Sequence, residues 1–146
     1  MQGTNRIGIG YFRCRLNPKK EHVSFTKEGE PEVECGEDCL ALAIADALLG
    51  AAALGSVGSN FSKNNDPMSI LNQTEKKIYF AKYKIVNLDI IFSPVSAFKK
   101  SVQQILSDLQ RLLFIETEQI NIKWSHSRGK DVDWMECHVV CLLGGR

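Results

Sequence analysis

The chain has no strong charge bias and no long uninterrupted apolar run. Its 146 residues carry 18 Lys and Arg against 17 Asp and Glu, which gives a formal net charge of +1. Proteins that bind nucleic acid or anionic membranes usually present a basic surface, so we expect no nucleic-acid partner. The longest apolar stretch, residues 40–54, is interrupted by Asp46 and is shorter than a membrane-spanning helix. We therefore predict no direct membrane insertion.

No targeting segment is recognisable in the sequence, and the number of cysteines is odd. Its first residues show neither the apolar core of a signal peptide nor the Arg- and Ser-rich pattern of a transit peptide. Five dispersed cysteines argue against a disulfide framework and favour a reducing compartment. We expect the interior of a plastid or another organelle, with any import sequence removed, if the source is eukaryotic. Otherwise we expect the cytoplasm.

Hydrophobic periodicity predicts a single α+β domain that spans residues 1–146. Strands are expected at residues 7–14, 85–92, 120–124 and 134–143, with a short hairpin from 23–25 and 32–34. Helices are expected at 38–54, at 66–79 with Asp66 as N-cap, and at 96–114 with Ser96 as N-cap, and a loop at 55–65. This order predicts a mixed β-sheet with helices packed on one face. The bare face of such a sheet must be covered, and a trimer would cover it.

An Ala- and Gly-rich segment, residues 46–58, is the most informative part of the sequence. It reads DALLGAAALGSVG, which predicts a closely packed helix followed by a polar bend. Together with RIGIG at 6–10 and NLDII at 87–91, it resembles the 2-C-methyl-D-erythritol 2,4-cyclodiphosphate synthase family. The resemblance extends over residues 6–143. It implies a trimer-forming fold with active sites between subunits, a zinc ion, a second divalent cation, and a reaction that closes a cyclic diphosphate and releases CMP.

The resemblance also places the family's zinc ligands on this chain. The family holds zinc with an Asp-x-His on the first strand and a His on the buried helix, and the matching residues here are Phe12, Cys14 and Leu42. A phenyl ring and an isobutyl group cannot ligate a metal, and one thiolate does not make a catalytic zinc site. We therefore expect neither a catalytic residue nor a metal cofactor in this chain.

Other pocket positions of the family are partly retained. The family's His-Ser-Asp-Gly-Asp matches ECGED at 34–38, and an acid of the following loop is replaced by Ser56. The family's Thr-Thr-Thr-Glu, which binds the cytidine diphosphate moiety and the second metal, matches SHSR at 125–128. The last of these changes replaces an acid with a base that would attract phosphate and repel a cation. The candidate retained pocket residues are Asp38, Asp46, Gly58, Ser125, Ser127 and Arg128.

Asp46 and the cysteines near the matched positions each have more than one interpretation. Asp46 is either a remnant of the active site or a side chain that bonds backbone near the following loop, and the second is favoured. Cys14, Cys35 and Cys39 could form a thiolate metal site, because thiolates suit zinc. Their spacing is not that of a zinc knuckle, however, and free cysteine often packs as a small apolar group.

Two main functions follow. The first is a non-catalytic homologue that acts as a structural or scaffold subunit of a larger assembly, as a homotrimer or as a heterotrimer with diverged paralogues. The alternative is an active divergent synthase that converts 4-diphosphocytidyl-2-C-methyl-D-erythritol 2-phosphate to the cyclic diphosphate, with release of CMP, in isoprenoid precursor biosynthesis. A weaker third is a binding module that keeps a phosphate or isoprenoid pocket. The joint loss of several catalytic groups favours the first, since such groups act as a unit.

Overall fold

The computed structural model describes residues 4–19, 24–25, 31–62, 66–125 and 133–146. Its strands are β1 (Arg6–Leu16), β2 (Ser24–Phe25), β3 (Pro31–Val33), β4 (Tyr83–Ser93), β5 (Ile120–Trp124) and β6 (Trp134–Gly145). Its helices are α1 (Gly36–Ala51), α2 (Val57–Asn60), α3 (Pro67–Phe80) and α4 (Val102–Leu113), with the short 3₁₀ segments η1 (Val95–Ala97) and η2 (Thr117–Gln119). The four expected long strands are present with shifts of a few residues at their ends, and β2 pairs antiparallel with β3 as expected of the hairpin, whose residue 23 lies outside the described residues.

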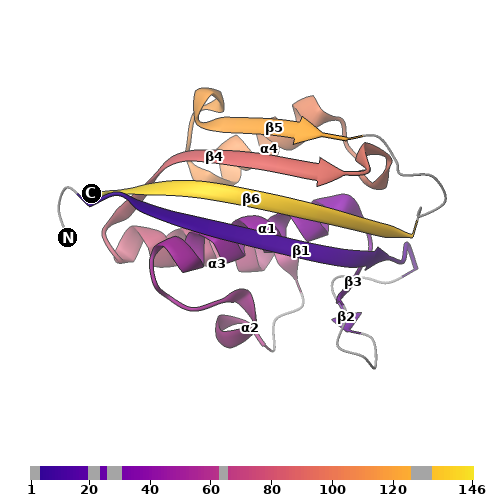
Figure 1. Cartoon of the computed structure of the whole chain (residues 1–146), viewed down its shortest axis with the longest axis horizontal. Coiled ribbons are helices and arrows are strands. Elements are labelled where there is room, and N and C mark those ends of the chain that lie inside the picture. Colours follow the sequence, from indigo (N-terminus) through magenta and orange to yellow (C-terminus); the bar gives the residue numbers. More distant parts are fainter. Residues whose placement is uncertain (1–3, 20–23, 26–30, 63–65, 126–132) are drawn as a thin grey trace.

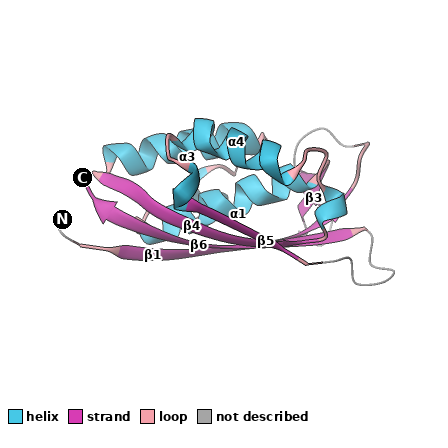
Figure 2. Cartoon of the chain, turned by 90° about the horizontal axis from the view of Figure 1, so that it is seen from above, coloured by secondary structure: helices cyan, strands magenta, loops and turns pink. Residues whose placement is uncertain are grey.

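The strands form one mixed sheet in the order β2-β3-β1-β6-β4-β5 (Figure 1). The central pairs β1–β6 and β6–β4 are antiparallel, whereas β4–β5 and β1–β3 are parallel. Helices α1, α3 and α4 lie on one face, and within the described ranges no element covers the other (Figure 2). This confirms the predicted α+β class with a mixed β-sheet and helices packed on one face. None of the described helices has the length and apolar content needed to span a bilayer.

The expected helix at 96–114 is wrong at its start. Ser96 lies in η1, and α4 begins only after Ser101, whose side chain accepts a hydrogen bond from the backbone N–H of Gln104 at 3.2 Å. The reason is a contact from far along the chain. Glu37 accepts hydrogen bonds from the backbone N–H groups of Lys99 and Lys100. In a helix with Ser96 as N-cap, the Lys100 N–H would bond to the Ser96 carbonyl instead, and Phe98, which is extended here, would be helical.

The other helix boundaries follow local capping rules. Asp66 is the N-cap of α3 and accepts a hydrogen bond from the N–H of Met68 at 3.2 Å, with Pro67 in the first turn, as predicted. The expected loop at 55–65 contains the short helix α2. A polar bend does follow α1, where Ala53 has φ of 58° and the N–H of Leu54 bonds to the carbonyl of Leu49 at 2.9 Å.

The close packing expected of the Ala- and Gly-rich segment occurs between α1 and β1. A Cβ atom added to Gly8 would lie 1.9 Å from the carbonyl oxygen of Ala47, and one added to Gly10 would lie 1.9 Å from that of Ala43. These distances are far below van der Waals contact, so only glycine lets the helix backbone approach the strand this closely. The strand glycines are thus as necessary as the helix alanines.

This contact predicts opposite effects for two glycine-to-alanine substitutions. We expect Gly10→Ala to lower the free energy of unfolding by about 3 kcal/mol, because the new methyl group forces β1 and α1 apart. Gly50→Ala is the matched control, since a Cβ there meets nothing within 4 Å. It should raise the free energy of unfolding by up to about 1 kcal/mol through helix propensity. Urea denaturation measures both; equal midpoints would show that the close contact is absent.

Candidate functional site

The three positions matched to zinc ligands lie between β1 and α1. Cys14 is 0% exposed and Leu42 3%, and Phe12 is partly buried against the same apolar core. Phe12 and Cys14 project from the same side of β1, as positions i and i+2 of a strand do. Within the described ranges, no three His, Cys, Asp or Glu side chains are placed so that they could hold a metal ion. The side chains at these three positions do not fit a zinc ion.

The thiol of Cys14 is in contact with the thiol of Cys39. Its S–H donates to the Cys39 sulfur at 3.0 Å, and the Cys39 S–H donates to the carbonyl oxygen of Phe12 at 3.6 Å. The hydrogen bond with Cys39, together with burial, raises the pKa of Cys14, and burial raises the pKa of Cys39. The structure thus brings together two of the three cysteines considered for a thiolate site.

Cys35 is placed differently from this pair. It is the N-cap residue of α1 and lines a surface cleft. Burial, with the negative charge of Asp38, raises the pKa of Cys35 to about 12. Its thiol is therefore protonated at neutral pH.

Asp46 has a structural role in this chain. Its carboxylate accepts a hydrogen bond from the backbone N–H of Val57 at 3.0 Å, and Val57 is the first residue of α2. The side chain therefore ties α1 to α2, which confirms the interpretation that Asp46 bonds backbone near the following loop. Gly58 is exposed on α2, where an added Cβ would be 3.8 Å from its nearest contact, Ser56 Oγ. Packing thus gives no reason for glycine at this position.

Of the remaining predicted pocket residues, Asp38 and Ser125 lie in the described part of the chain. Asp38 is half-buried in the first turn of α1, where burial and the neighbouring charge of Glu34 raise its pKa. Ser125 follows β5, and its backbone N–H donates to the carbonyl of Phe92 at 3.1 Å. Ser127 and Arg128 lie outside the described residues.

A surface cleft of about 410 Å³ opens between α1, α3 and α4. Its walls include apolar side chains from all three helices: Leu40, Ala41, Met68, Leu71, Ile105, Leu109 and Leu112. Charged residues also line it, namely Glu34, Glu37, Lys99, Lys100, Asp108 and Arg111. The cleft has the size of a small-molecule site, but its cations already have acidic partners.

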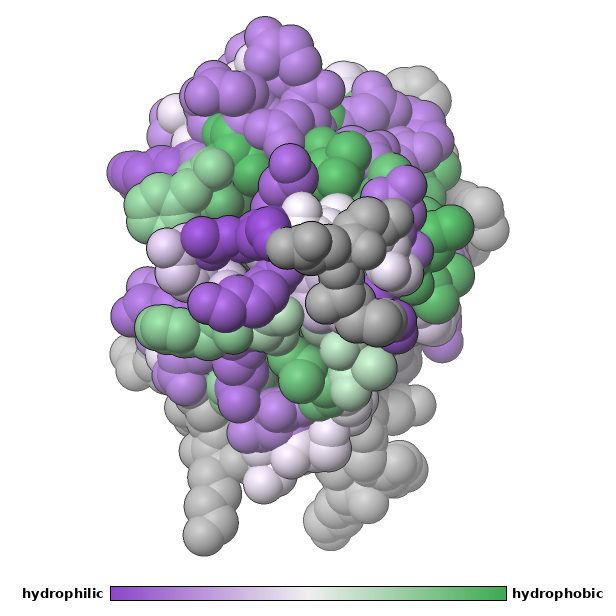
Figure 3. Space-filling model, turned by 90° about the vertical axis from the view of Figure 1, so that its left-hand side faces the viewer, coloured by the Kyte–Doolittle hydropathy of each residue, from purple (hydrophilic) through white to green (hydrophobic). Residues whose placement is uncertain are grey.

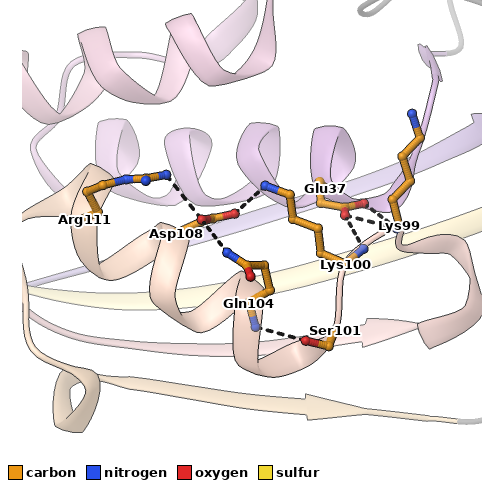
Figure 4. Close-up of polar contacts among 7 residues, drawn as sticks. All are labelled: Glu37, Lys99, Lys100, Ser101, Gln104, Asp108 and Arg111. Carbon is orange, nitrogen blue, oxygen red and sulfur yellow. Dashed lines mark hydrogen bonds and ion pairs between the residues drawn. The ribbon is translucent and has the colours of Figure 1, made fainter.

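The charged residues of this cleft are linked to one another (Figure 4). Asp108 accepts from Lys100 at 2.6 Å and from Arg111 at 3.2 Å. The hydrogen bond from Lys100 is the main reason why the pKa of Asp108 lies below its usual range. Lys99 pairs with Glu34. Glu37 accepts hydrogen bonds from two backbone N–H groups at 2.8–3.0 Å. Sequence reasoning missed this role of Glu37 because its partners are 62 and 63 positions away.

The uncovered sheet face presents a strip of apolar side chains. Ile7 is 74% exposed and Ile9 68%, and Tyr11, Ile91 and Val140 are also exposed. The register places Ile9 beside Val140, and it places His138 between Tyr11 and Ile91. We call these six residues the sheet-face strip: Ile7, Ile9, Tyr11, Ile91, His138 and Val140.

Polar groups border the sheet-face strip. On the β4–β5 side, Lys123 pairs with Asp89 at 3.1 Å, and Asn121 donates to Asp89 at 3.1 Å. Toward the C-terminal end of β1, Tyr11 donates to Glu136 at 3.2 Å, and the Arg13 guanidinium lies over the Trp134 ring at 4.2 Å. An apolar centre with a polar border is the usual composition of a protein–protein interface.

Apolar groups also reach the surface at the end of the molecule where the termini lie, but in separate patches (Figure 3). Phe80 is 76% exposed, and Tyr79 and Phe114 are exposed as well. The Arg146 guanidinium stacks on the Tyr79 ring at 3.5 Å. Single exposed apolar residues are common in soluble proteins, so these separate patches are weaker evidence for a protein–protein interface than the sheet-face strip.

Solved structures define the class of fold. IspF from Plasmodium falciparum in a CDP complex superposes with a TM-score of 0.73 at 24% identity, covering 100% of this chain and 99% of the other. The bifunctional IspDF from Campylobacter jejuni gives a TM-score of 0.74 at 22% identity, covering 98% of this chain and 43% of the other. The fold is therefore of the cyclodiphosphate synthase type.

Sequence comparison then identifies the family. The sequence model of the YgbB family matches residues 6–143. A 2-C-methyl-D-erythritol 2,4-cyclodiphosphate synthase from Desulfatibacillum aliphaticivorans is 35% identical over 135 residues, which cover 85% of this chain and 87% of the relative. One from Desulforamulus reducens is 29% identical over 133 residues, 81% and 82% of the two chains. The chain belongs to the YgbB family, which confirms the resemblance.

The contact of Asp46 predicts a local loss of stability when the carboxylate is removed. We expect Asp46→Ala to lower the free energy of unfolding by about 1.5 kcal/mol, because the Val57 N–H loses a charged acceptor. Hydrogen exchange of the Val57 amide should become faster in the same variant. Asp46→Asn keeps a side-chain oxygen and is the control, with a smaller loss. Unchanged exchange of Val57 in Asp46→Ala would contradict the assignment.

Proposed function

We propose that this member of the YgbB family is a structural subunit of a protein assembly that does not catalyse cyclodiphosphate formation. One observation carries the proposal: Phe12 and Leu42 occupy two of the three positions matched to zinc ligands, and both pack into the apolar core. When catalytic groups act as a unit, removing one or two of them lowers the reaction rate by orders of magnitude. In this chain, none of the three matched positions has the residue type that the family uses.

The surroundings of these positions support this proposal. At two of the three matched positions, a divalent cation would meet the apolar side chains of Phe12 and Leu42 instead of ligands, and burying an ion with an incomplete ligand set is unfavourable. The sulfur that remains, Cys14, is one ligand, whereas a catalytic zinc site has three protein ligands. The residue types at these positions thus oppose metal binding.

The sheet-face strip supports the assembly part of the proposal. Soluble antiparallel sheets with one bare face usually alternate apolar residues inward with polar residues outward. In β1, Ile7 and Ile9 project outward instead, and both are more than two-thirds exposed in the single chain. We propose that further copies of this chain, or diverged paralogues, cover the strip in a trimer within a larger complex.

An active divergent synthase is the second candidate, and the names of the curated relatives favour it. Such an enzyme would convert 4-diphosphocytidyl-2-C-methyl-D-erythritol 2-phosphate to the cyclic diphosphate and release CMP. It would need a metal held by Cys14, Asp38 or Asp46, or by a neighbouring subunit. The Cys14 S–H donates to Cys39, so Cys14 would lose this hydrogen bond on becoming a thiolate ligand, and Asp46 already uses Oδ1 to accept from the backbone of Val57.

The two candidates differ in zinc content and turnover. We expect the purified protein to release no CMP from the diphosphocytidyl substrate, with or without added zinc, and to hold less than about 0.1 zinc per chain. The triple variant F12D/C14H/L42H restores the ligand types and should hold about one zinc per chain. Metal analysis after gel filtration measures this. Wild-type protein with one tightly held zinc and steady CMP release would show that the synthase is the correct function.

The sheet-face strip predicts a change in oligomeric state. We expect native mass spectrometry of the wild-type chain to show trimers, and Ile9→Lys to shift the population to monomers, because burying three charges in one interface is unfavourable. Phe80→Lys is the matched control: Phe80 is equally exposed in the single chain but lies on α3. A monomeric wild type, or equal dissociation in both variants, would exclude the strip as the homotrimer interface.

A further inference from the structure

Two thiols in the core, Cys14 and Cys39, are placed as reaction partners. Their sulfurs lie 3.0 Å apart, and both side chains are 0% exposed. A disulfide bond is about 2.05 Å long, so the sulfurs need to approach by only about 1 Å. We propose that Cys14 and Cys39 are an oxidisable pair that closes an intrachain disulfide between β1 and α1. This proposal does not depend on whether the protein is an enzyme.

The packing of β1 on α1 explains why the two sulfurs meet. Gly10 and Cys14 are on the same side of β1, because their positions differ by an even number. Cys39 and Ala43 are on the same side of α1, one helical turn apart. Gly8 lies against Ala47 and Gly10 against Ala43, so β1 and α1 run in opposite directions, and later residues of β1 meet earlier residues of α1. The residues of the pair are 25 positions apart, and the close backbone contact holds them together.

Of the other described cysteines, Cys141 and Cys35 have other surroundings, whereas Cys137 is also next to Cys39. The Cys141 S–H donates to the carbonyl oxygen of Ala47 at 3.3 Å, so its hydrogen-bond partner is backbone. Cys35 lines the surface cleft. Cys137 is a neighbour of Cys39, and its thiol contributes to the raised pKa of Cys39. The rival bond to test is therefore Cys39–Cys137.

Hydrogen peroxide is a sufficient oxidant for this reaction. One thiol loses its proton and attacks a peroxide oxygen; an S–O bond forms, the O–O bond breaks, and hydroxide leaves and becomes water. The second sulfur then attacks the sulfenic sulfur; the S–S bond forms, the S–O bond breaks, and the leaving oxygen takes the second proton as water. Two thiols and one peroxide thus give one disulfide and two waters.

Burial sets the rate of this reaction. Peroxide reaches the pair only through local opening of the core, and the raised pKa of both thiols keeps them protonated at neutral pH. Oxidation of the folded protein should therefore be slow, because it waits for this local opening. In a reducing compartment the pair rests as the dithiol and closes under peroxide.

The test is peptide mapping of the full-length protein after peroxide treatment. We expect two of the five thiols to be lost, a mass decrease of about two hydrogens, and a Cys14–Cys39 linked peptide that dithiothreitol releases. The midpoint of thermal unfolding should rise by about 10 °C in the oxidised form. A Cys39–Cys137 peptide, or thiol loss with added oxygen and no linked peptide, would overturn the assignment.

Two further arms make the result specific. Cys14→Ser should abolish the linked peptide, whereas Cys141→Ser, a substitution at another buried core position, should leave it unchanged. If Cys14→Ser does not fold, the wild-type map alone decides. Zinc added before peroxide should give no protection; complete protection by one equivalent of zinc would identify the thiols as metal ligands and refute the redox pair.

Discussion

The close approach of the α1 backbone to the β1 backbone is the constraint on which the rest of the structure depends. Gly8 and Gly10 lack the side-chain atom that would otherwise separate the two elements. This contact holds α1 against the sheet, and β6 and α3 also pack on the helix and complete its burial. It also determines what meets in the core: the thiols of Cys14 and Cys39, and the apolar side chains of Phe12 and Leu42. Helices α3 and α4 lie on the same side, which leaves the opposite sheet face uncovered in the described part of the chain.

Much of the fold could be predicted because the information for it is local. Alternating or continuous apolar residues mark the long strands, and Asp66 followed by Pro67 marks the start of α3. The start of α4 could not be predicted in this way. Ser96 and Ser101 are equally good N-caps by type, and the choice between them is made by Glu37, which bonds the backbone of Lys99 and Lys100. Long-range contacts of this kind leave no periodic pattern in the sequence.

At the candidate site, too, some properties follow from residue type alone and others depend on long-range contacts. That Phe12 and Leu42 cannot ligate a metal follows from their side chains alone. That Cys14 meets Cys39, while Cys35 lines a surface cleft, depends on the register of β1 against α1 and needed the structure. Asp46 shows that an acid at a position matched to the family's pocket can be explained by its own hydrogen bond to Val57.

The glycines of β1 also have a consequence for the family resemblance. The segment RIGIG at 6–10 is part of the pattern that resembles the family, and its two glycines are required by the contact with α1. This requirement is one of packing, and it holds whatever the chain binds or catalyses. The segment therefore identifies the fold, and the chemistry of positions 12, 14 and 42 has to be judged separately from it.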